Sequence, residues 1–593
     1  MFLSLWILLT YQGLHMETAA KSPEISFDLT MPRATNHYFD ITMTISRYSK
    51  EYVDIVLPVW APGSYKVRDF SRNIEQLSAM TLDGKPLRAE KTEKNIWRIY
   101  TNKVPDFKIM YDYYAFELSV RTSYLDTDHG YLNGSNLFFY VDGQKEVPYR
   151  LRIHLPDRWK NVSTGLPVEA AKKFAYIAST YDELADCPVE MGNHDIVSFE
   201  VKGIPHEMAI YGFGQYNRAT LIEDVTKVIE QTAEIVGEIP YKKYVFIIHM
   251  LPNQGGGLEH MNSTTLGVDT WFFQDPEKYL NFLTLVAHEY FHLWNVKRLR
   301  PVALGPFDYT KENYTSLLWV SEGFTSYFDE QIVMRAGFMK PEKYLNRLES
   351  SLQNYLKVPG RLVQPLDASS FDTWIKFYVT DENSQNATVS YYNKGSVVAL
   401  LLDLEIMSRT DGKKRLDDVM RWLWINTYKK NRGYTMEDLV RGCEEVAGGS
   451  WTSFFDQLVF STAEIDFEKY LRHVGLTLIS QASSQITLGI DMDNSSRENV
   501  MVRSVVRDGP AYQTGVSAGD EILAINGIRV SARTLNQRLQ TYQAGDAVSL
   551  SISRNLKLFD LECVLTRDRP TYNLKSVDSP SDTQKRLHAA WTQ

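Results

Sequence analysis

Apolar and polar residues alternate through the first third of the chain. Residues 39–45 (FDITMTI) and 52–57 (YVDIVL) both follow this pattern, and Pro and Gly interrupt such runs, as at 61–63 (APG). Successive side chains of a strand point to opposite faces, so this period is typical of half-buried strands. We therefore predict a β-rich N-terminal domain over residues 23–204.

The period changes from that of a strand to that of a helix near residue 219. One helical face carries Leu221, Val225, Val228, Ile229, Thr232 and Ile235, and Gly237 with Pro240 ends the run. Residues 244–251 form a short apolar run typical of a strand. Further helices are expected at 278–295, at 315–336 and within 395–460. These segments predict a mostly helical second domain over residues 205–470.

Beyond residue 475 the pattern returns to short β-like runs separated by glycines. We predict a small β-rich domain over residues 476–572 and a polar tail over residues 573–593. A chain of 593 residues is long enough for three or more folded units. The fold class predicted is multidomain α+β.

Charge and cysteine content exclude several classes of protein. Lys plus Arg number 64 and Asp plus Glu number 73, without a long single-sign block, so no nucleic-acid surface is expected. Cys187, Cys443 and Cys563 are far apart and odd in number, which fits neither a disulfide framework nor a cysteine zinc site. Any bound metal must therefore use His and carboxylate ligands.

The N-terminal residues 1–22 form either a signal peptide or a short extension. A brief apolar run precedes Thr18-Ala-Ala20, which suits a cleavage site and favours export to the periplasm or the exterior. The alternative is a cytoplasmic protein, because no Lys or Arg precedes the run and Met16 is a second candidate start. Elsewhere no apolar stretch approaches the ~20 residues that span a bilayer, so no transmembrane segment is expected.

Residues 288–292 (HEYFH) carry the pattern H-E-x-x-H within a predicted helix. His288 and His292 then lie one turn apart on the same face, where both imidazoles can bind one Zn²⁺ ion. Glu289 is placed to take a proton from a water on that ion. The plainer alternative is a pair of core or surface histidines.

A third ligand is expected from residues 319–328 (WVSEGFTSYF). This segment resembles the gluzincin zinc peptidases, whose aminopeptidase branch carries W-x-x-E-G-F-x-x-Y after H-E-x-x-H. The resemblance implies a thermolysin-like catalytic domain with one zinc ion, and Glu322 as the third ligand. The spacing departs from the commoner pattern, because 29 residues lie between His292 and Glu322. The alternative for Glu322 is a helix surface charge.

A longer segment, residues 288–301 (HEYFHLWNVKRLRP), closely resembles the glycyl aminopeptidase family of gluzincins. Matching stretches at 57–65 (LPVWAPGSY), 256–260 (GGLEH) and 390–395 (SYYNKG) extend the resemblance over nearly the whole chain. The family implies a β-rich N-terminal domain, a gluzincin catalytic domain and a PDZ domain. It also implies a preference for small N-terminal residues, Gly and Ala above all.

Residues 256–260 resemble the G-x-M-E-N element of related aminopeptidases. The resemblance implies that Gly256, Gly257 and His260 line the substrate cleft and that Glu259 binds the free α-amine. An ammonium group in a closed cleft needs such a carboxylate partner. The alternative is a glycine-rich turn with an incidental acid, and His260 replaces the usual Asn.

Residues 391–395 resemble the family's Y-x-K-G element, whose Tyr donates a hydrogen bond to the oxyanion. Aligning the element on its final Lys-Gly selects Tyr392, with the neighbouring Tyr391 left as the alternative. Both residues could instead be plain core or cleft aromatics.

The C-terminal segment, near 476–570, resembles a PDZ domain in residues 486–490 (ITLGI), 502–506 (VRSVV) and 509–527. In that fold a peptide adds as a strand after Leu488, Gly489 and Ile490, whose amides receive a terminal carboxylate. A helix at 534–543 would form the other wall. The alternative is a packed β domain without a ligand.

Together these motifs predict a zinc aminopeptidase that acts on peptides with a free N-terminus. Two other functions remain open at this point. One is an endopeptidase that uses the PDZ-like domain to capture substrate tails. The other is a peptide-binding protein whose peptidase domain is inactive.

Overall fold

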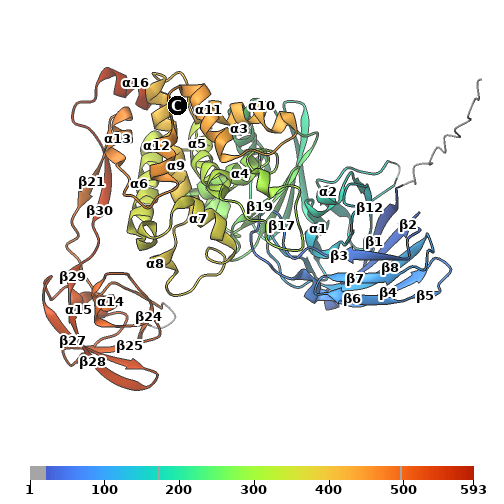
Figure 1. Ribbon diagram of the computed structural model, residues 1–593, viewed down its shortest axis with the longest axis horizontal. Coiled ribbons are helices and arrows are strands. Elements are labelled where there is room, and N and C mark those ends of the chain that lie inside the picture. The colour runs from blue at the N-terminus through green and yellow to red at the C-terminus, as the bar shows by residue number, and fades with distance from the viewer. Residues whose placement is uncertain (1–21, 171, 494–496) are drawn as a thin grey trace, which may run out of the picture.

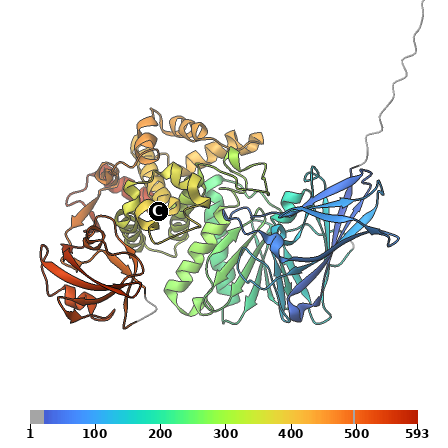
Figure 2. The same ribbon diagram turned by 60° about the horizontal axis from the view of Figure 1, so that its bottom comes forward.

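The computed structural model describes residues 22–170, 172–493 and 497–593. The predicted signal peptide or extension falls almost wholly outside these residues. Figure 1 shows a β-rich N-terminal unit, a helical central unit and a small C-terminal β unit, as the multidomain α+β prediction requires. Figure 2 shows the two β units at opposite ends of the molecule, with the helices between them. Within the described residues no helix combines the length and hydrophobicity that a membrane span needs.

Alternation builds the N-terminal unit as predicted. In β2 (Tyr38–Ser46) the side chains of Phe39, Ile41, Met43 and Ile45 are all buried, while the residues between them are partly exposed. A seven-stranded sheet packs beside two four-stranded sheets around one apolar core. The strands are β1 (Glu24–Arg33), β2, β3 (Tyr52–Val56), β4 (Ile74–Thr81), β5 (Pro86–Leu87), β6 (Ala89–Glu93), β7 (Ile96–Tyr100), β8 (Phe107–Tyr114), β9 (Tyr124–Leu125), β10 (His129–Leu132), β11 (Tyr140–Val141), β12 (Tyr149–His154), β13 (Asn161–Thr164), β14 (Ala175–Ala178) and β15 (Val189–Gly192), with short helices α1 (Gly134–Leu137) and α2 (Tyr181–Ala185).

The central unit starts on a five-stranded sheet, earlier in the chain than predicted. Its strand order is β16-β17-β18-β20-β19, and β16 (Asp195–Val201) forms an antiparallel hairpin with β17 (Ile204–Gly212). The predicted boundary between residues 204 and 205 therefore falls inside this hairpin. The error arose because β16 alternates like the strands before it, and alternation alone cannot say which sheet a strand joins. The remaining strands are β18 (Tyr244–Met250), β19 (Gly257–Glu259) and β20 (Ser263–Val268).

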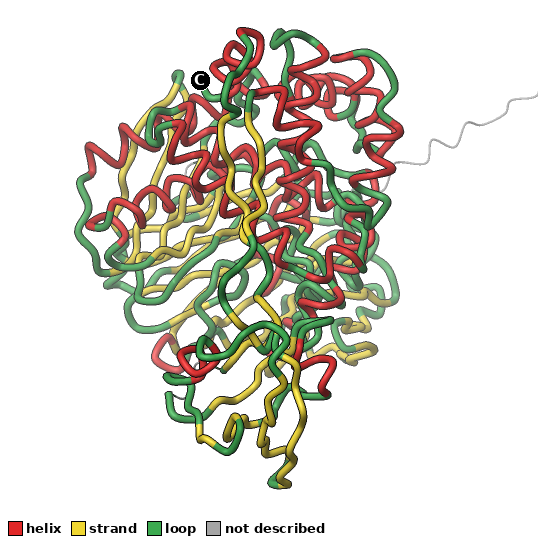
Figure 3. The backbone as a smooth tube through the Cα atoms, turned by 90° about the vertical axis from the view of Figure 1, so that its left-hand side faces the viewer, coloured by secondary structure: helices red, strands yellow, loops and turns green. Residues whose placement is uncertain are grey.

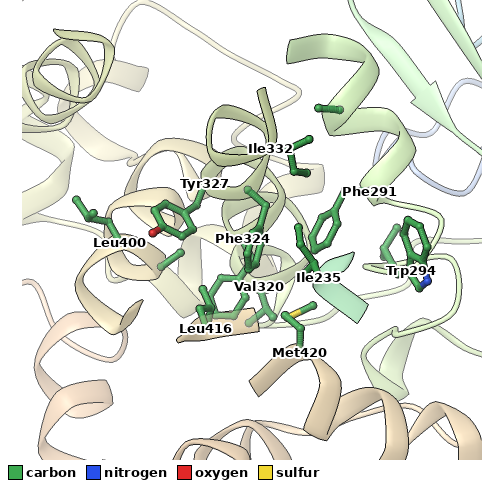
Figure 4. Packing of buried hydrophobic residues seen from close by; sticks show 14 of the residues in the cluster. Ile235, Phe291, Trp294, Val320, Phe324, Tyr327, Ile332, Leu400, Leu416 and Met420 are labelled. Atoms are coloured by element: carbon green, nitrogen blue, oxygen red, sulfur yellow. The ribbon is translucent and has the colours of Figure 1, made fainter. Parts of the chain in front are cut away.

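Helix α3 (Arg218–Val236) connects β17 to the parallel strand β18. The predicted apolar face is buried, Asn217 caps the helix N-terminus, and Gly237 ends it in the left-handed conformation that favours glycine. Figure 4 shows Ile235 of this helix packed in the helical core with Phe291, Val320, Phe324, Leu400 and Met420, each from a different helix. The other helices of the unit are α4 (Pro276–Phe291), the π-helical turn η5 (Trp319–Gly323), α5 (Phe324–Arg335), α6 (Pro341–Lys357), α7 (Leu366–Phe371), α8 (Ser384–Ala387), α9 (Tyr391–Arg409), α10 (Leu416–Asn426), α11 (Met436–Ala447), α12 (Thr452–Leu458) and α13 (Phe467–Leu471).

The C-terminal β unit is attached to the central unit by a two-stranded ribbon. Strands β21 (Leu476–Gln481) and β30 (Thr571–Ser576) pair antiparallel and run side by side down the middle of Figure 3. The unit also touches α8, because Asn386 donates to Val505 O at 2.8 Å and accepts from Arg507 N at 2.8 Å. Its elements are β22 (Ile486–Thr487), β23 (Ile490–Met492), β24 (Val500–Val505), α14 (Pro510–Thr514), β25 (Glu521–Ile525), β26 (Ile528–Arg529), α15 (Leu535–Leu539), β27 (Ala547–Arg554), β28 (Lys557–Val564) and β29 (Thr566–Arg567).

The predicted polar tail, residues 573–593, was wrong. Its first residues complete β30, and the rest forms helix α16 (Asp582–Trp591), which packs against the central unit. Ser581 and Gln584 form a capping box that starts the helix. Leu587 and Trp591, four residues apart, bury one apolar stripe among otherwise polar residues. The high polar content of the segment concealed this stripe.

Replacement of Trp591 tests this packing. The indole is fully buried, its Nε1 donates to Tyr327 Oη at 3.0 Å, and its ring lies 5.4 Å from that of Tyr344. Because a cavity would remain and the Tyr327 hydroxyl, which also donates to Asp403 Oδ2, would lose the bond from the indole, Trp591→Ala should destabilise the central unit by about 3–5 kcal/mol. Chemical denaturation measures the loss, and the exposed Lys585→Ala on the same helix is the control. Equal stability of the two variants would show that α16 does not pack as described.

Candidate active site

Helix α4 carries the H-E-x-x-H pattern into the interior. Asp275 caps its N-terminus by accepting from the amides of Glu277 and Lys278, and Pro276 occupies the first turn. The helix ends at Phe291, so His292 is its C-terminal cap. His288 and His292 lie one turn apart with ring centroids 4.7 Å from each other, as the spacing predicts.

Glu322 reaches both imidazoles from the π-helical turn η5. Its Oε2 atom lies 3.2 Å from His292 Nε2 and 3.7 Å from His288 Nε2. Two ligand atoms of a tetrahedral zinc ion lie about 3.4 Å apart, since each is about 2.1 Å from the metal. The three side chains are therefore spaced so that they could hold one metal ion, and they are called the metal-binding group below.

The outer ring nitrogens of both histidines have fixed partners. His288 Nδ1 lies 2.8 Å from Asp329 Oδ2, and His292 Nδ1 lies 2.8 Å from the carbonyl oxygen of Asn295. When each Nδ1–H donates to its oxygen, the Nε2 lone pair faces Glu322, which is the tautomer a metal requires. The Asn295 side chain also donates to the carbonyls of Val320 and Ser321 and so holds η5 in place.

A close crossing of two helices brings Tyr392 to the metal-binding group. A Cβ atom at Gly323 would lie 2.4 Å from Gly395 Cα, so only glycine allows η5 and α9 to approach this closely. Tyr392, near the start of α9, then packs beside His288 with ring centroids 6.5 Å apart. Tyr391 turns the other way, is fully buried, and accepts from Thr373 Oγ1 at 3.1 Å.

Edge strand β19 brings two further residues to the site, Glu259 and Gly257. Glu259 is buried, and its Oε1 has no hydrogen-bond partner among the described residues. Gly63 of the N-terminal unit lies directly against it, since a Cβ there would be 2.5 Å from Glu259 Oε1. On the same strand, a Cβ at Gly257 would lie 2.4 Å from the Glu289 carboxyl group. Two glycines thus let backbone approach two carboxylates.

The two glutamates nearest the histidines have pKa values shifted in opposite directions. Burial raises the pKa of Glu289 to about 7, although His288 and His292 oppose that shift. Burial also acts to raise the pKa of Glu322, but the charges and hydrogen bonds of both imidazoles outweigh it and lower the value to about 2. Glu322 is therefore ionised, as a ligand must be, while Glu289 is suited to exchanging a proton near neutral pH.

These groups surround a cavity of about 380 Å³, called the cleft below. Two arginines, Arg121 of the N-terminal unit and Arg347 of α6, add positive charge to a wall otherwise rich in carboxylates. Arg121 also donates to Gly257 O at 3.3 Å. The lining residues are Gly63, Arg121, Gly256, Gly257, Glu259, Asn281, Thr284, Leu285, His288, Glu289, His292, Glu322, Asp329, Arg347 and Tyr392.

Of the residues expected at the substrate site, His260 is the one that the structure places outside the cleft lining. Its Nδ1 lies 3.4 Å from Asp186 Oδ1, in a buried network with Lys297. The predicted carboxylate loop of the C-terminal unit belongs to a separate place in the fold. Gly489 has φ +70°, and Ile490 begins β23, which lies at the edge of its sheet.

Sequence reasoning gave no role at the site to several residues that line or support the cleft, among them Gly63, Arg121, Asn295 and Asp329. Asp329 could have been found, because it follows Glu322 by seven residues, two helical turns on the same face. Asn295 lies just beyond the H-E-x-x-H helix without any spacing rule to mark it. Gly63 lies in the 57–65 stretch that carries the family resemblance, but no sequence spacing connects it, or Arg121 of the same unit, to the site.

Comparison with known proteins places the chain in a family. Residues 26–193 match the Peptidase M61 N-terminal domain, residues 281–398 the M61 glycyl aminopeptidase domain, and residues 487–565 a PDZ domain. No curated protein matches the chain.

Two solved structures illustrate the range of similarity. An aminopeptidase N family protein from Idiomarina loihiensis is 31% identical, with 96% of this chain and 100% of that chain covered and a TM-score of 0.89. An M1 zinc metallopeptidase from Deinococcus radiodurans is 12% identical, with 75% of this chain and 95% of that chain covered and a TM-score of 0.48. The family matches and the 31% identity over the whole fold agree with the cleft geometry. The chain therefore belongs to the M61 glycyl aminopeptidase family and is an aminopeptidase with a C-terminal PDZ domain.

Proposed function

We propose that the protein is a zinc-dependent aminopeptidase that removes small N-terminal residues, Gly and Ala above all, from peptides. One observation carries this proposal. A His-His-Glu metal-binding group, a buried proton-exchanging carboxylate and a second, unpaired carboxylate share one cleft. The first two are what peptide hydrolysis needs, and the third is what recognition of a free amine needs.

The donor set fits a zinc ion. His288, His292 and Glu322 supply two nitrogens and one oxygen, and both imidazoles are held in the metal-binding tautomer by Asp329 and by the Asn295 carbonyl. When bound there, zinc acts as a Lewis acid that polarises the scissile carbonyl and lowers the pKa of water. Three protein ligands leave a coordination position open, which is typical of catalytic sites and not of structural ones.

Glu289 and Tyr392 act on the reacting atoms. Glu289, which lines the cleft beside the metal-binding group, accepts a proton from the attacking water and returns it to the departing amine. The Tyr392 hydroxyl faces the cleft beside His288, where it can donate to the oxyanion as charge develops. The buried Tyr391, already bonded to Thr373, has no such access.

Glu259 supports recognition of the N-terminus. A buried carboxylate oxygen without a partner is costly, and a substrate ammonium group would satisfy it. The Gly63 backbone closes against this carboxylate and limits the space beside the first residue of the substrate. This close approach favours a substrate residue with a small side chain.

We further propose that the PDZ domain binds the C-terminus of a peptide. Strand β23 is an edge strand, so its outer backbone groups are open to a strand added beside it, with α15 as the opposite wall. In this proposal the backbone amides of Leu488, Gly489 and Ile490 receive the carboxylate.

Removal of the base should separate metal binding from turnover. Glu289→Gln keeps the shape of the side chain and all three ligands but cannot accept the proton, so kcat should fall by about 10²–10⁴-fold. Zinc content, measured by elemental analysis, should stay at the wild-type level. Glu342→Gln, on the exposed face of α6, is the control and should change neither quantity. A Glu289→Gln enzyme with wild-type kcat would rule out the assigned role.

A matched pair of tyrosine variants tests the oxyanion donor. Tyr392→Phe removes one hydroxyl from the cleft and should lower kcat by about 10²–10³-fold with little change in KM, because the hydrogen bond forms only in the transition state. Tyr391→Phe removes a hydroxyl bonded to Thr373 and should affect stability more than kcat. The reverse ranking of the two kcat values would assign the role to Tyr391.

The amine-binding role of Glu259 is tested with paired substrates. Hydrolysis of glycyl and alanyl arylamides should fall about 10–100-fold in kcat/KM in Glu259→Gln, since a bond to a charged group is lost. The N-acetylated forms should be poor substrates for the wild-type enzyme. Rapid cleavage of acetylated substrates would instead support an endopeptidase.

A further inference from the structure

Three buried side chains with metal-binding atoms meet between the N-terminal unit and the central sheet. His129 lies in β10, Glu190 in β15 and His249 in β18, and one ligand atom from each lies within 4.8 Å of the others. All three are buried, with relative exposures of 0%, 0% and 1%. The group shares no residue with the cleft and plays no part in the proposed reaction.

Strand register explains why these side chains face one another. In the β10–β15 ladder Glu190 is opposite Tyr131, so His129, two residues before Tyr131, points to the same face of the sheet. In the central sheet His249 is opposite Tyr211, and the His129 ring stacks on the Tyr211 ring at 3.5 Å between centroids. Two sheets from different units therefore aim their ligating groups into the layer between them.

Contacts within the protein leave this group incompletely bonded. Glu190 Oε2 lies 2.9 Å from His249 Nε2, which accounts for one oxygen and one nitrogen. Glu190 Oε1 and both ring nitrogens of His129 have no hydrogen-bond partner among the described residues. Buried polar atoms are nearly always paired, so three unpaired atoms in one place indicate a missing partner.

We propose that His129, Glu190 and His249 hold a second divalent transition-metal ion of the zinc class. Two imidazole nitrogens and one carboxylate oxygen are ligands that suit zinc and exclude a preference for Ca²⁺ or Mg²⁺, which bind oxygen. One ion gives electron-pair donors on all three side chains a shared partner. A proton shared by Glu190 and His249 would leave His129 unpaired.

Charge at the site agrees with a divalent cation. The ion adds two positive charges, Glu190 removes one, and the carboxylate of Asp126 can offset the other because its Oδ1 lies 3.8 Å from His129 Nδ1. At 3.8 Å this is a charge contact and not the hydrogen bond that Asp329 makes with His288 Nδ1 at 2.8 Å.

Three protein ligands leave a position open here too, but this group is fully buried and apart from the cleft, so the ion would have a structural role. Its ligands come from both units, so it fixes the N-terminal unit against the central sheet. The Gly63 loop, which closes against Glu259, belongs to that same N-terminal unit. A metal between the sheets therefore helps to set the position of one wall of the cleft without touching substrate.

Zinc stoichiometry of the full-length protein tests the inference. Wild type and the double variant His288→Ala/His292→Ala are stripped with a chelator, dialysed against zinc alone and analysed for metal. We expect about two zinc ions per chain in wild type and about one in the double variant, which leaves the buried group intact. Zinc should also raise the melting temperature of the double variant, because the ion binds the folded state.

Adding Glu190→Gln to the double variant should reduce zinc binding from about one ion to about none and remove the shift in melting temperature. Adding His154→Ala, which breaks an exposed His154–Asp28 pair, is the control and should change neither. Circular dichroism verifies that each variant is folded, and His129→Gln replaces Glu190→Gln if the latter is not. A double variant that binds no zinc, or one whose bound zinc persists after a folded buried-group substitution, overturns the inference while leaving the proposed aminopeptidase function intact.

Discussion

The crossing of η5 and α9 at Gly323 and Gly395 is the constraint on which the cleft depends. A Cβ at Gly395 would lie 2.8 Å from the Trp319 carbonyl oxygen and 2.9 Å from Gly323 Cα, so neither position tolerates a side chain without movement of a helix. With the helices in contact, Glu322 reaches the histidines of α4 and Tyr392 faces the same space. A separation of even one methyl group would displace Glu322 relative to the two histidines, and a metal site built from these three side chains would tolerate little displacement.

Two folded units build the cleft together. The central unit supplies the metal-binding group and Glu289, and the N-terminal unit brings Gly63 and Arg121 to the opposite wall. The loop that carries Gly63 is held by the central unit, because Trp60 Nε1 donates to Asp308 O at 2.9 Å and Val59 N to Tyr309 O at 2.9 Å. Recognition of the substrate N-terminus therefore depends on the contacts between the two units, whereas the chemical step depends mainly on residues of the central unit.

Sequence patterns predicted the features that depend on residues close together in the chain. Alternation identified strands such as β2, a 3.6-residue period identified α3 with its Gly237 cap, and H-E-x-x-H placed two histidines on one face. The choice between Tyr391 and Tyr392 needed the structure, since adjacent helical residues point about 100° apart and only packing decides which faces the cleft. Contacts between units could not be derived at all: neither the Gly63 approach to Glu259 nor the meeting of His129 with His249 has a sequence spacing. The polar composition of residues 573–593 led to the wrong prediction of a tail, because it concealed Leu587 and Trp591, the two apolar residues that anchor α16.

The return of the chain through β30 to α16 affects how the molecule is made. The PDZ domain lies between two segments of the central unit. Trp591, a fully buried side chain of the central unit, is synthesised after the whole PDZ domain. A ribosome releases residues in order, so the central core stays open at the α16 site until the PDZ domain has emerged. The central core thus gains its α16 contacts only after the PDZ domain has been made, which ties completion of the peptidase core to synthesis through that domain.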